Sequence, residues 1–364
     1  MGMQSSPLAH KKERIYAFDY LRGYFIAVII IDHVWKFPSL WTAFTGEARL
    51  WVTAAEGFIM ISGFLIGYIR GLKGMKLPFS VIASTLLRRA FMLYVWMILV
   101  SIAYTAIDWY LTAVPDIPSL PAAVGDWSEA IRLIVTMEHP NLWIHFLSLY
   151  TIFLALSVPV VWLLRNNKSW LVGALTLAVY LLGAVYDVEW MKWQLPFFVM
   201  ALFGFYFESL RVWWSSIGKQ RRLQTQIAIY AAALLTLALS VVCVYFPATL
   251  PSALVESLNQ LFNIELFSIA RVVLAVIWFG ALAFLFHHFT PFIRRWSYGV
   301  LEFLGTHSLS AYIIHGFVIC AVNYFLVVSG LSQGFILNTL IGLGTVLAVY
   351  GLLRIPFVAK IIPR

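Results

Sequence analysis

Charged residues are scarce in this chain. Only 11% of its 364 residues are Asp, Glu, Lys or Arg, whereas 62% are hydrophobic. Soluble globular domains carry about 25% charged residues, so this composition excludes a water-soluble domain of this size. The mean hydropathy of +0.87 instead predicts a polytopic integral membrane protein in contact with the lipid bilayer.

Cysteine is almost absent as well. Cys243 and Cys320 both lie in apolar runs, which excludes a disulfide framework and a cysteine-based metal site. His287 and His288 are adjacent, and neighbours on a helix point about 100° apart, so no metal is expected there. The sequence shows no soluble domain, repeat or cleavable signal peptide. We therefore expect a single membrane domain over 1–364, with a cytoplasmic tail at 1–15.

Long apolar runs define the predicted fold. Runs of about 20 residues can cross the hydrocarbon core, and the chain has ten of them. The fold class is therefore an all-α bundle of about ten transmembrane helices. The predicted spans are 16–36, 50–69, 83–106, 142–164, 169–186, 193–210, 226–246, 266–287, 308–328 and 335–356.

Lysines and arginines indicate the orientation. The net charge of +9 could suggest a nucleic-acid partner, but the positions of the charges follow the predicted membrane topology instead, so no nucleic acid is expected. Loops rich in lysine and arginine stay on the cytoplasmic side of a membrane, which predicts that both termini are cytoplasmic. Of the 25 basic residues, two lie within spans (Arg22 and Arg271), and nineteen are assigned to the cytoplasmic side. Only four are assigned to the extracytoplasmic side: Lys36, Arg49, Arg132 and Lys192.

The longest connection, 107–141, is predicted to face the extracytoplasmic side. It contains five acidic residues, and its stretch DWSEAIRLIVTM has a helical apolar period typical of a helix on the membrane surface. A loop of this length could cap an external site or simply connect two spans.

Ionisable side chains are concentrated in the first span. At about 100° per residue, His33 lies within roughly 20° of Arg22, and Asp19 within roughly 60°. The eleven residues from Arg22 to His33 rise roughly 16 Å. A charge inside a bilayer costs roughly 3 kcal/mol or more unless it is paired or hydrated. We therefore expect these residues to serve chemistry or transport, with Asp19 pairing with Arg22.

The second and third spans extend this pattern. Glu56 is predicted at the level of His33, and Gly63 lies on the same face, where it could let a neighbouring helix approach closely. Arg88 and Arg89 are placed near the inner surface, either as phosphate ligands or as interfacial anchors. Arginines thus gather at the cytoplasmic end. A histidine that Glu56 or Asp32 could orient lies at the outer end, where it could act as a general base.

These residues resemble a known superfamily. FDYLRGYFIAVIIIDH is similar to the first helix of the membrane acyltransferase-3 superfamily, whose hallmark is an arginine and a histidine separated by ten residues. AAEGFIMISGFLIGY resembles its second helix, and LGTHSLSAYIIH resembles a late element of that superfamily. Ala-Glu-Gly-Phe at Glu56, HPNLWIHFLSLYTIFLALSVPVVWLL and KWQLPFFVMALFG resemble the OpgC branch, the succinyltransferases of osmoregulated periplasmic glucans.

The resemblance implies transfer of an acyl group from cytosolic acyl-CoA, succinyl-CoA or acetyl-CoA, to a carbohydrate hydroxyl outside a bacterial inner membrane. His33 matches the catalytic histidine, with Glu56 or Asp32 as its partner, and Arg22 matches the donor arginine. Arg89 matches one arginine of an Arg-x-x-Arg element whose other position is Leu86, so Arg88 could substitute. We expect the donor to contact Arg22, Arg88, Arg89, Lys73 and Lys76.

Further polar residues are candidates for the substrate path. Arg271 could bind the acceptor or a succinyl carboxylate, or pair with Glu265. Trp193 could stack on a sugar or belong to the interfacial aromatic belt. Ser308, Tyr312 and His315 share one helix face, which could line the path or bond neighbouring helices. The full set of substrate-binding candidates is Asp19, Ser62, Asn141, His145, Arg271, Trp193, Gln194, Tyr312 and His315.

Two functions remain open at this stage. The leading one is a membrane O-acyltransferase, and the other is a transporter or flippase whose buried charges form a proton or substrate relay. No inverted repeat or matched pair of broken helices is visible, which argues against transport. The sequence leaves open the acceptor, the acyl group and the oligomeric state. It also leaves open whether His33 acts as a base or carries the acyl group.

Overall fold

The structure is a computed structural model that describes residues 16–111, 114 and 116–363, so the predicted tail at 1–15 lies outside it. All regular elements in these residues are helical. The longer helices are α1 (Tyr16–Val34), α3 (Ala54–Leu65), α4 (Phe79–Tyr110), α6 (His145–Arg165), α7 (Ser169–Tyr186), α8 (Glu189–Phe205), α10 (Lys219–Tyr245), α12 (Ile269–His288), α15 (Ser308–Ser329) and α16 (Phe335–Arg354).

Shorter helices connect these elements. They are α2 (Thr42–Thr45), α5 (Trp127–Val135), α9 (Phe207–Ser216), α11 (Ser252–Leu261), α13 (Thr290–Trp296), α14 (Val300–Thr306) and α17 (Pro356–Ile361), with 3₁₀ turns η1 (Gly46–Ala48), η3 (Lys73–Lys76), η4 (Leu142–Ile144) and η5 (Pro247–Thr249) and the π-helical η2 (Ile66–Leu72). The predicted surface helix in the 107–141 connection is confirmed as a helix, α5, which begins with Asp126 as its N-cap.

Eight helices in the described chain are long and apolar enough to cross a membrane. A ninth span arises if α8 and α9, which are bent by 63° relative to each other, are counted together. The chain is therefore an integral membrane protein. With that pair counted as one span, nine of the ten predicted spans are found, and α1 is the exception because it carries Asp19, Arg22 and Asp32 within 19 residues.

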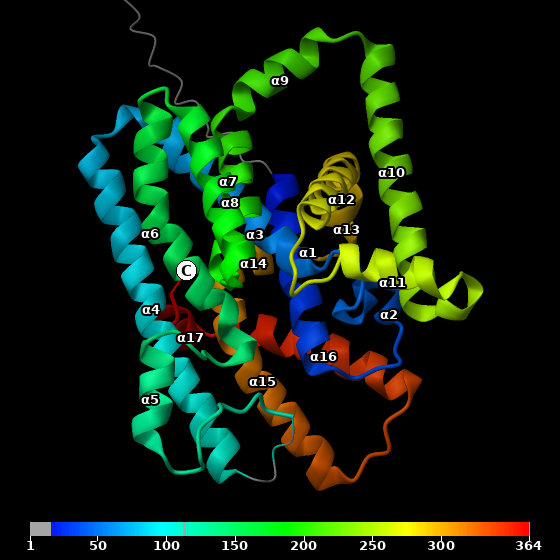
Figure 1. Ribbon diagram of the computed structural model, residues 1–364. Coiled ribbons are helices and arrows are strands. Elements are labelled where there is room, and N and C mark those ends of the chain that lie inside the picture. The colour runs from blue at the N-terminus through cyan, green and yellow to red at the C-terminus, as the bar shows by residue number, and fades with distance from the viewer. Residues whose placement is uncertain (1–15, 112–113, 115, 364) are drawn as a thin grey trace, which may run out of the picture.

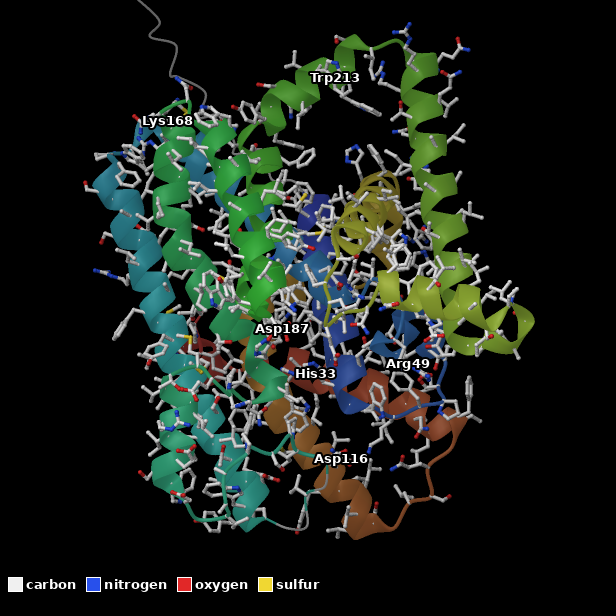
Figure 2. The ribbon with its side chains drawn as sticks, in the orientation of Figure 1. His33, Arg49, Asp116, Lys168, Asp187 and Trp213 are labelled. Atoms are coloured by element: carbon white, nitrogen blue, oxygen red, sulfur yellow. The ribbon has the colours of Figure 1, made fainter. Side chains whose placement is uncertain are left out.

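The charged helix α1 lies at the centre of the bundle. It packs against α3, α12, α14, α15 and α16 (Figure 1), which cover it on several sides. In Figure 2, Lys168 and Trp213 mark one end of the bundle and Asp116 the other, with His33 between them. The surrounding helices thus shield the polar residues of α1 from lipid.

Glycines permit the closest helix contacts. A Cβ atom at Gly63 of α3 would overlap the carbonyl group of Phe197 on α8, and one at Gly23 of α1 would overlap that of Leu301 on α14. The predicted close approach at Gly63 is confirmed. These contacts fix α3 against α8 and α1 against α14, and so they hold in place the two helices that carry Glu56 and His33.

Replacing Gly63 by alanine is therefore expected to destabilise the protein by about 1–3 kcal/mol, because the added methyl group forces backbone apart. The matched control is Gly173→Ala on α7, where a Cβ would meet nothing within 4 Å. Alanine in an open helix position stabilises by about 0.5–1 kcal/mol. Thermal unfolding in detergent should show a lower midpoint for Gly63→Ala and no lower midpoint for Gly173→Ala. Equal midpoints for the two variants would contradict this packing.

Candidate active site

Two histidines meet between α1 and α15. The Nδ1 atom of His33 lies 2.7 Å from the Nε2 atom of His315, and their ring centroids are 4.9 Å apart. The Nδ1 atom of His315 lies 2.6 Å from the backbone carbonyl oxygen of Tyr312. His315 is fully buried, whereas His33 is only partly buried. Part of the His33 side chain is therefore accessible, whereas that of His315 is not.

Glu56 does not orient His33 in the structure, because its carboxylate is used elsewhere. One oxygen accepts from the backbone N–H of Thr53 at 3.0 Å and from its hydroxyl at 2.6 Å, in a capping box that begins α3. The other oxygen accepts from Arg271 Nε at 2.6 Å. Glu56 is 0% exposed and Arg271 2%.

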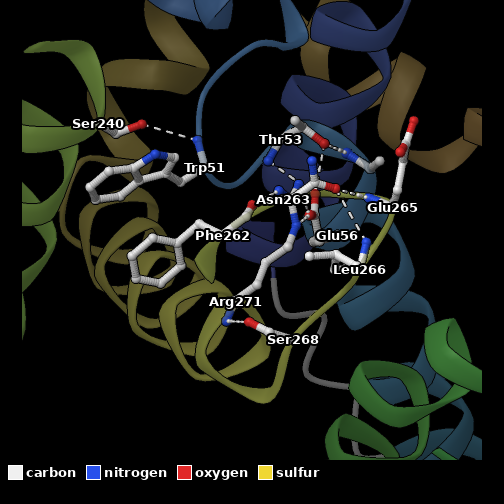
Figure 3. A network of polar contacts seen from close by, with 11 residues as sticks. Trp51, Thr53, Glu56, Ser240, Phe262, Asn263, Glu265, Leu266, Ser268 and Arg271 are labelled. Atoms are coloured by element: carbon white, nitrogen blue, oxygen red, sulfur yellow. Dashed lines mark hydrogen bonds and ion pairs between the residues drawn. The ribbon is translucent and has the colours of Figure 1, made fainter. Parts of the chain in front are cut away.

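Arg271 thus pairs with Glu56 and not with Glu265 (Figure 3). Its Nη1 also donates to the carbonyl of Phe262 at 2.6 Å, and its backbone N–H to the hydroxyl of Ser268 at 3.1 Å. Because the two buried charges neutralise each other, this arginine is committed to joining α3 and α12. Its Nη2 atom has no hydrogen-bond partner among the described residues, and Arg271 also lines a pocket with Trp51 and Asn259, so the acceptor role predicted for it stays a prediction.

Asp32 is the other predicted partner of His33, and it too points elsewhere. It is 7% exposed and interacts with Thr45 on α2, while its Oδ1 has no hydrogen-bond partner among the described residues. Consecutive helix residues diverge by about 100°, so His33 can face α15 while Asp32 faces α2. The partner supplied by the fold is His315.

Three arginines gather near the other end of α1. Arg22 donates to the hydroxyl of Ser308, the first residue of α15, at 2.6 Å. It also lies within electrostatic range of Asp19, Tyr150 and Arg89. Arg70 in turn lies within range of Arg89 and Tyr150.

This arginine cluster, comprising Arg22, Arg70 and Arg89, has unused donors. The Nε atoms of Arg22 and Arg89 are buried and have no hydrogen-bond partner in the described part of the chain. Like charges that converge with unpaired donors favour an anionic ligand, and arginine forks suit phosphate. The cluster can therefore hold a phosphorylated group.

The other predicted donor residues lie outside this cluster. Arg88 is exposed and lines a groove on α4 with Ser80, Ser84 and Thr85, because it points about 100° away from Arg89. It therefore does not replace the missing arginine at Leu86, which is buried. Lys73 pairs with Glu208 at 3.4 Å.

Several predicted substrate residues make internal contacts instead. Ser62 donates to the Phe58 carbonyl of its own helix at 2.8 Å. Asn141 caps η4 through the backbone N–H of Trp143 and donates to the Pro118 carbonyl at 2.8 Å. Both side chains are buried, and Asn141 joins η4 to the loop at Pro118, whereas Ser62 bonds within its own helix. The substrate role predicted for them stays a prediction.

Trp193 and Gln194 are also enclosed. Trp193 is 4% exposed and packs against Phe267, with ring centroids 4.2 Å apart and ring planes tilted by 37°, so Phe267 and not a sugar lies against it. Gln194 donates to the carbonyls of Thr176 and Met191.

The two lysines predicted to contact the donor, Lys73 and Lys76, are exposed, and Asp19 is partly buried.

His145 and Tyr312 lie nearer to the histidine pair. His145 Nε2 is a buried atom 3.0 Å from a carboxylate oxygen of Glu189, although the residue as a whole is partly exposed. The Tyr312 hydroxyl accepts from the backbone N–H of Phe146, beside His145, at 3.3 Å. The ring of Tyr312 lies 5.2 Å from that of His315. His145 therefore remains an available candidate for contact with an acceptor.

Sequence reasoning missed two features of this site. It did not single out Arg70, although Arg70 follows Glu56 and Gly63 at the same seven-residue spacing. Arg70 lies in η2, and π-helical segments are frequent at functional sites. It also placed His315 on the substrate path and not against His33, because a single sequence does not say which helices pack together.

One comparison with known proteins confirms the resemblance to the OpgC branch. Residues 14–358 match the family model described as OpgC protein. No curated protein matches the chain, and no solved structure does.

Proposed function

The chain belongs to the OpgC family, and from this membership we propose that it is a membrane O-acyltransferase with acyl-CoA as donor and a carbohydrate or glycan hydroxyl as acceptor. The family itself implies acyltransferase activity in a membrane. Succinyl is the favoured acyl group, with acetyl as the alternative. One arrangement in the site carries the proposal.

That arrangement is the pair of contacts between α1 and α15. Arg22 meets Ser308 at the first, and His33 meets His315 at the second. Eleven residues separate the two positions on α1, a rise of roughly 16 Å. The phosphates of CoA would bind the arginine cluster, and the extended pantetheine arm would carry the thioester along α1 to His33.

The chemistry at His33 follows from its partial exposure. As a general base it takes the proton of the acceptor hydroxyl, whose oxygen then attacks the thioester carbonyl carbon. The carbon–sulfur bond breaks, and the CoA thiolate takes the proton back from the His33 imidazolium. The products are an ester on the acceptor and free CoA, so His33 ends each cycle unchanged.

We place this site in a bundle of ten spans with α1 as the first. Both termini are cytoplasmic in this topology, the arginine cluster faces the cytosol, and His33 lies toward the outer side of a bacterial cytoplasmic membrane. The positive-inside distribution of lysines and arginines supports this orientation. So does Figure 2, in which Lys168 and Asp116 lie at opposite ends of the bundle.

Calorimetry on the purified protein tests the donor site. We expect succinyl-CoA, acetyl-CoA and CoA to bind, and Arg22→Gln to weaken that binding about 10- to 100-fold, because a hydrogen bond to a charged group contributes roughly 1.5–3 kcal/mol. The tighter of the two thioesters identifies the acyl group. The matched control is Arg88→Gln, which removes the same charge from an exposed position outside the cluster.

Two results would contradict the donor site. Equal weakening by Arg22→Gln and Arg88→Gln would show that general positive charge and not the cluster attracts CoA. No binding of any of the three compounds to the folded protein would refute the acyltransferase proposal and favour transport.

A further inference from the structure

We propose that His315 is a positioning residue: a neutral imidazole that accepts a hydrogen bond from His33 and thereby keeps the Nε2 atom of His33 unprotonated. This inference rests on the proposed function for its chemical purpose. Its geometric basis is independent of that function, because it follows from the contacts of the two rings.

The first step concerns the proton on His315. Its Nδ1 atom lies 2.6 Å from the Tyr312 carbonyl oxygen. A carbonyl can only accept a hydrogen bond, so Nδ1 must carry the hydrogen. A neutral imidazole has one N–H, which leaves Nε2 of His315 as an acceptor.

The second step transfers this constraint to His33. The acceptor nitrogen of His315 lies 2.7 Å from the Nδ1 atom of His33, and a bond between them requires a hydrogen on Nδ1. The neutral His33 ring must then have its lone pair on Nε2. The backbone of α15 therefore sets, through two hydrogen bonds, which nitrogen of His33 can act as a base.

Burial explains why a neutral partner stands here. His315 is 0% exposed, and burying an ionised carboxylate costs far more free energy than burying a neutral hydrogen-bonded ring. The two carboxylates that the sequence predicted as partners of His33 are engaged elsewhere. Glu56 pairs with Arg271, and Asp32 interacts with Thr45. His315 thus orients His33 without adding a charge to the interior of the bundle.

The consequence for the reaction is a defined proton position. The acceptor proton moves to Nε2 of His33, and the resulting imidazolium keeps donating from Nδ1 to His315. When the carbon–sulfur bond breaks, the same proton leaves Nε2 for the CoA thiolate. No proton passes to His315, so a side chain that merely accepts a hydrogen bond should replace it.

Two substitutions test this point. The side-chain oxygen of His315→Gln can accept from His33 Nδ1, whereas His315→Leu fills space without an acceptor. We expect the kcat of the glutamine variant to stay within about 10-fold of the parent and that of the leucine variant to fall about 10²-fold or more. The donor KM should be unchanged in both. Equal losses, or equal retention, in two folded variants would overturn the proposal.

A second measurement needs no activity. Nitrogen NMR on protein labelled at histidine distinguishes the two neutral tautomers, and a His33→Gln spectrum identifies the His33 signals. We expect the Nδ1–H form of His33 in the parent and in His315→Gln, and its loss in His315→Leu. An Nε2–H form in the parent would overturn the inference even if the protein transfers acyl groups. If His33 has the Nδ1–H form but the protein does not transfer acyl groups, only the proposed function is overturned.

Discussion

Replacing His33 by glutamine is expected to lower acyl transfer by about 10²–10⁴-fold, the range that a positioned general base contributes. Glutamine can still donate a hydrogen bond to His315, but it has no nitrogen that takes up a proton near neutral pH. Donor binding should survive, because the arginine cluster lies about three helical turns away along α1. We would measure the initial rate of acyl transfer with labelled acyl-CoA, and the binding of CoA by calorimetry.

The control for this experiment is His288→Gln at the end of α12. His288 is exposed and lies outside the pair formed by His33 and His315. Its substitution should leave the rate unchanged. A His33→Gln protein that transfers acyl groups at the parental rate would show that the site has been misplaced.

Replacing Arg271 by methionine is expected to destabilise the protein by about 3–5 kcal/mol, because it leaves the carboxylate of Glu56 buried without a counter-charge. The thermal unfolding midpoint in detergent should fall sharply. The double variant Glu56→Gln, Arg271→Met should recover part of the loss, since neither charge then remains in the interior.

Arg132→Met supplies the matched control. Arg132 pairs with Glu129 on α5 and with Glu138, which follows that helix, and the three side chains are 39–49% exposed. Exposed ion pairs contribute about 0–1 kcal/mol, so this variant should unfold near the parental midpoint. A loss at Arg271 no larger than the loss at Arg132 would contradict the structural role assigned to the pair of Glu56 and Arg271.

The sequence predicted local features of the molecule well. Hydrophobic runs identified the helices, and the 3.6-residue period placed Arg22 and His33 on one face of α1. The close approach at Gly63 also followed from spacing. Each of these depends on residues near one another in the chain, where helix geometry alone determines relative position.

The partners of these residues could not be predicted in the same way. His33 and His315 are 282 positions apart, and Glu56 and Arg271 are 215 apart. Which helix faces meet depends on packing across the whole bundle. Glu56, which the predicted topology puts at the depth of His33, was therefore assigned to it, although the fold places Glu56 against α12.

The direction in which a side chain points around its helix axis explains why the predicted donor residues differ from the observed arginine cluster. Arg88 and Arg89 are equivalent in a positive-inside count, yet one is exposed on α4 and the other joins the arginine cluster. The sequence gives their angular separation but not which of them points inward. Burial of Leu86, three residues before Arg89, identifies the inward face only once the structure is known.

Membrane vesicles of defined orientation show whether the protein carries an acyl group from the cytoplasmic face to an acceptor on the other side. Labelled succinyl-CoA or acetyl-CoA would be supplied outside inverted vesicles, in which the cytoplasmic face is exposed to the bath, with a glucan enclosed in the lumen. We expect labelled glucan in the lumen, none with His33→Gln, and none when the donor is supplied outside right-side-out vesicles. Equal labelling from both faces, or labelling that survives in His33→Gln, would contradict this expectation.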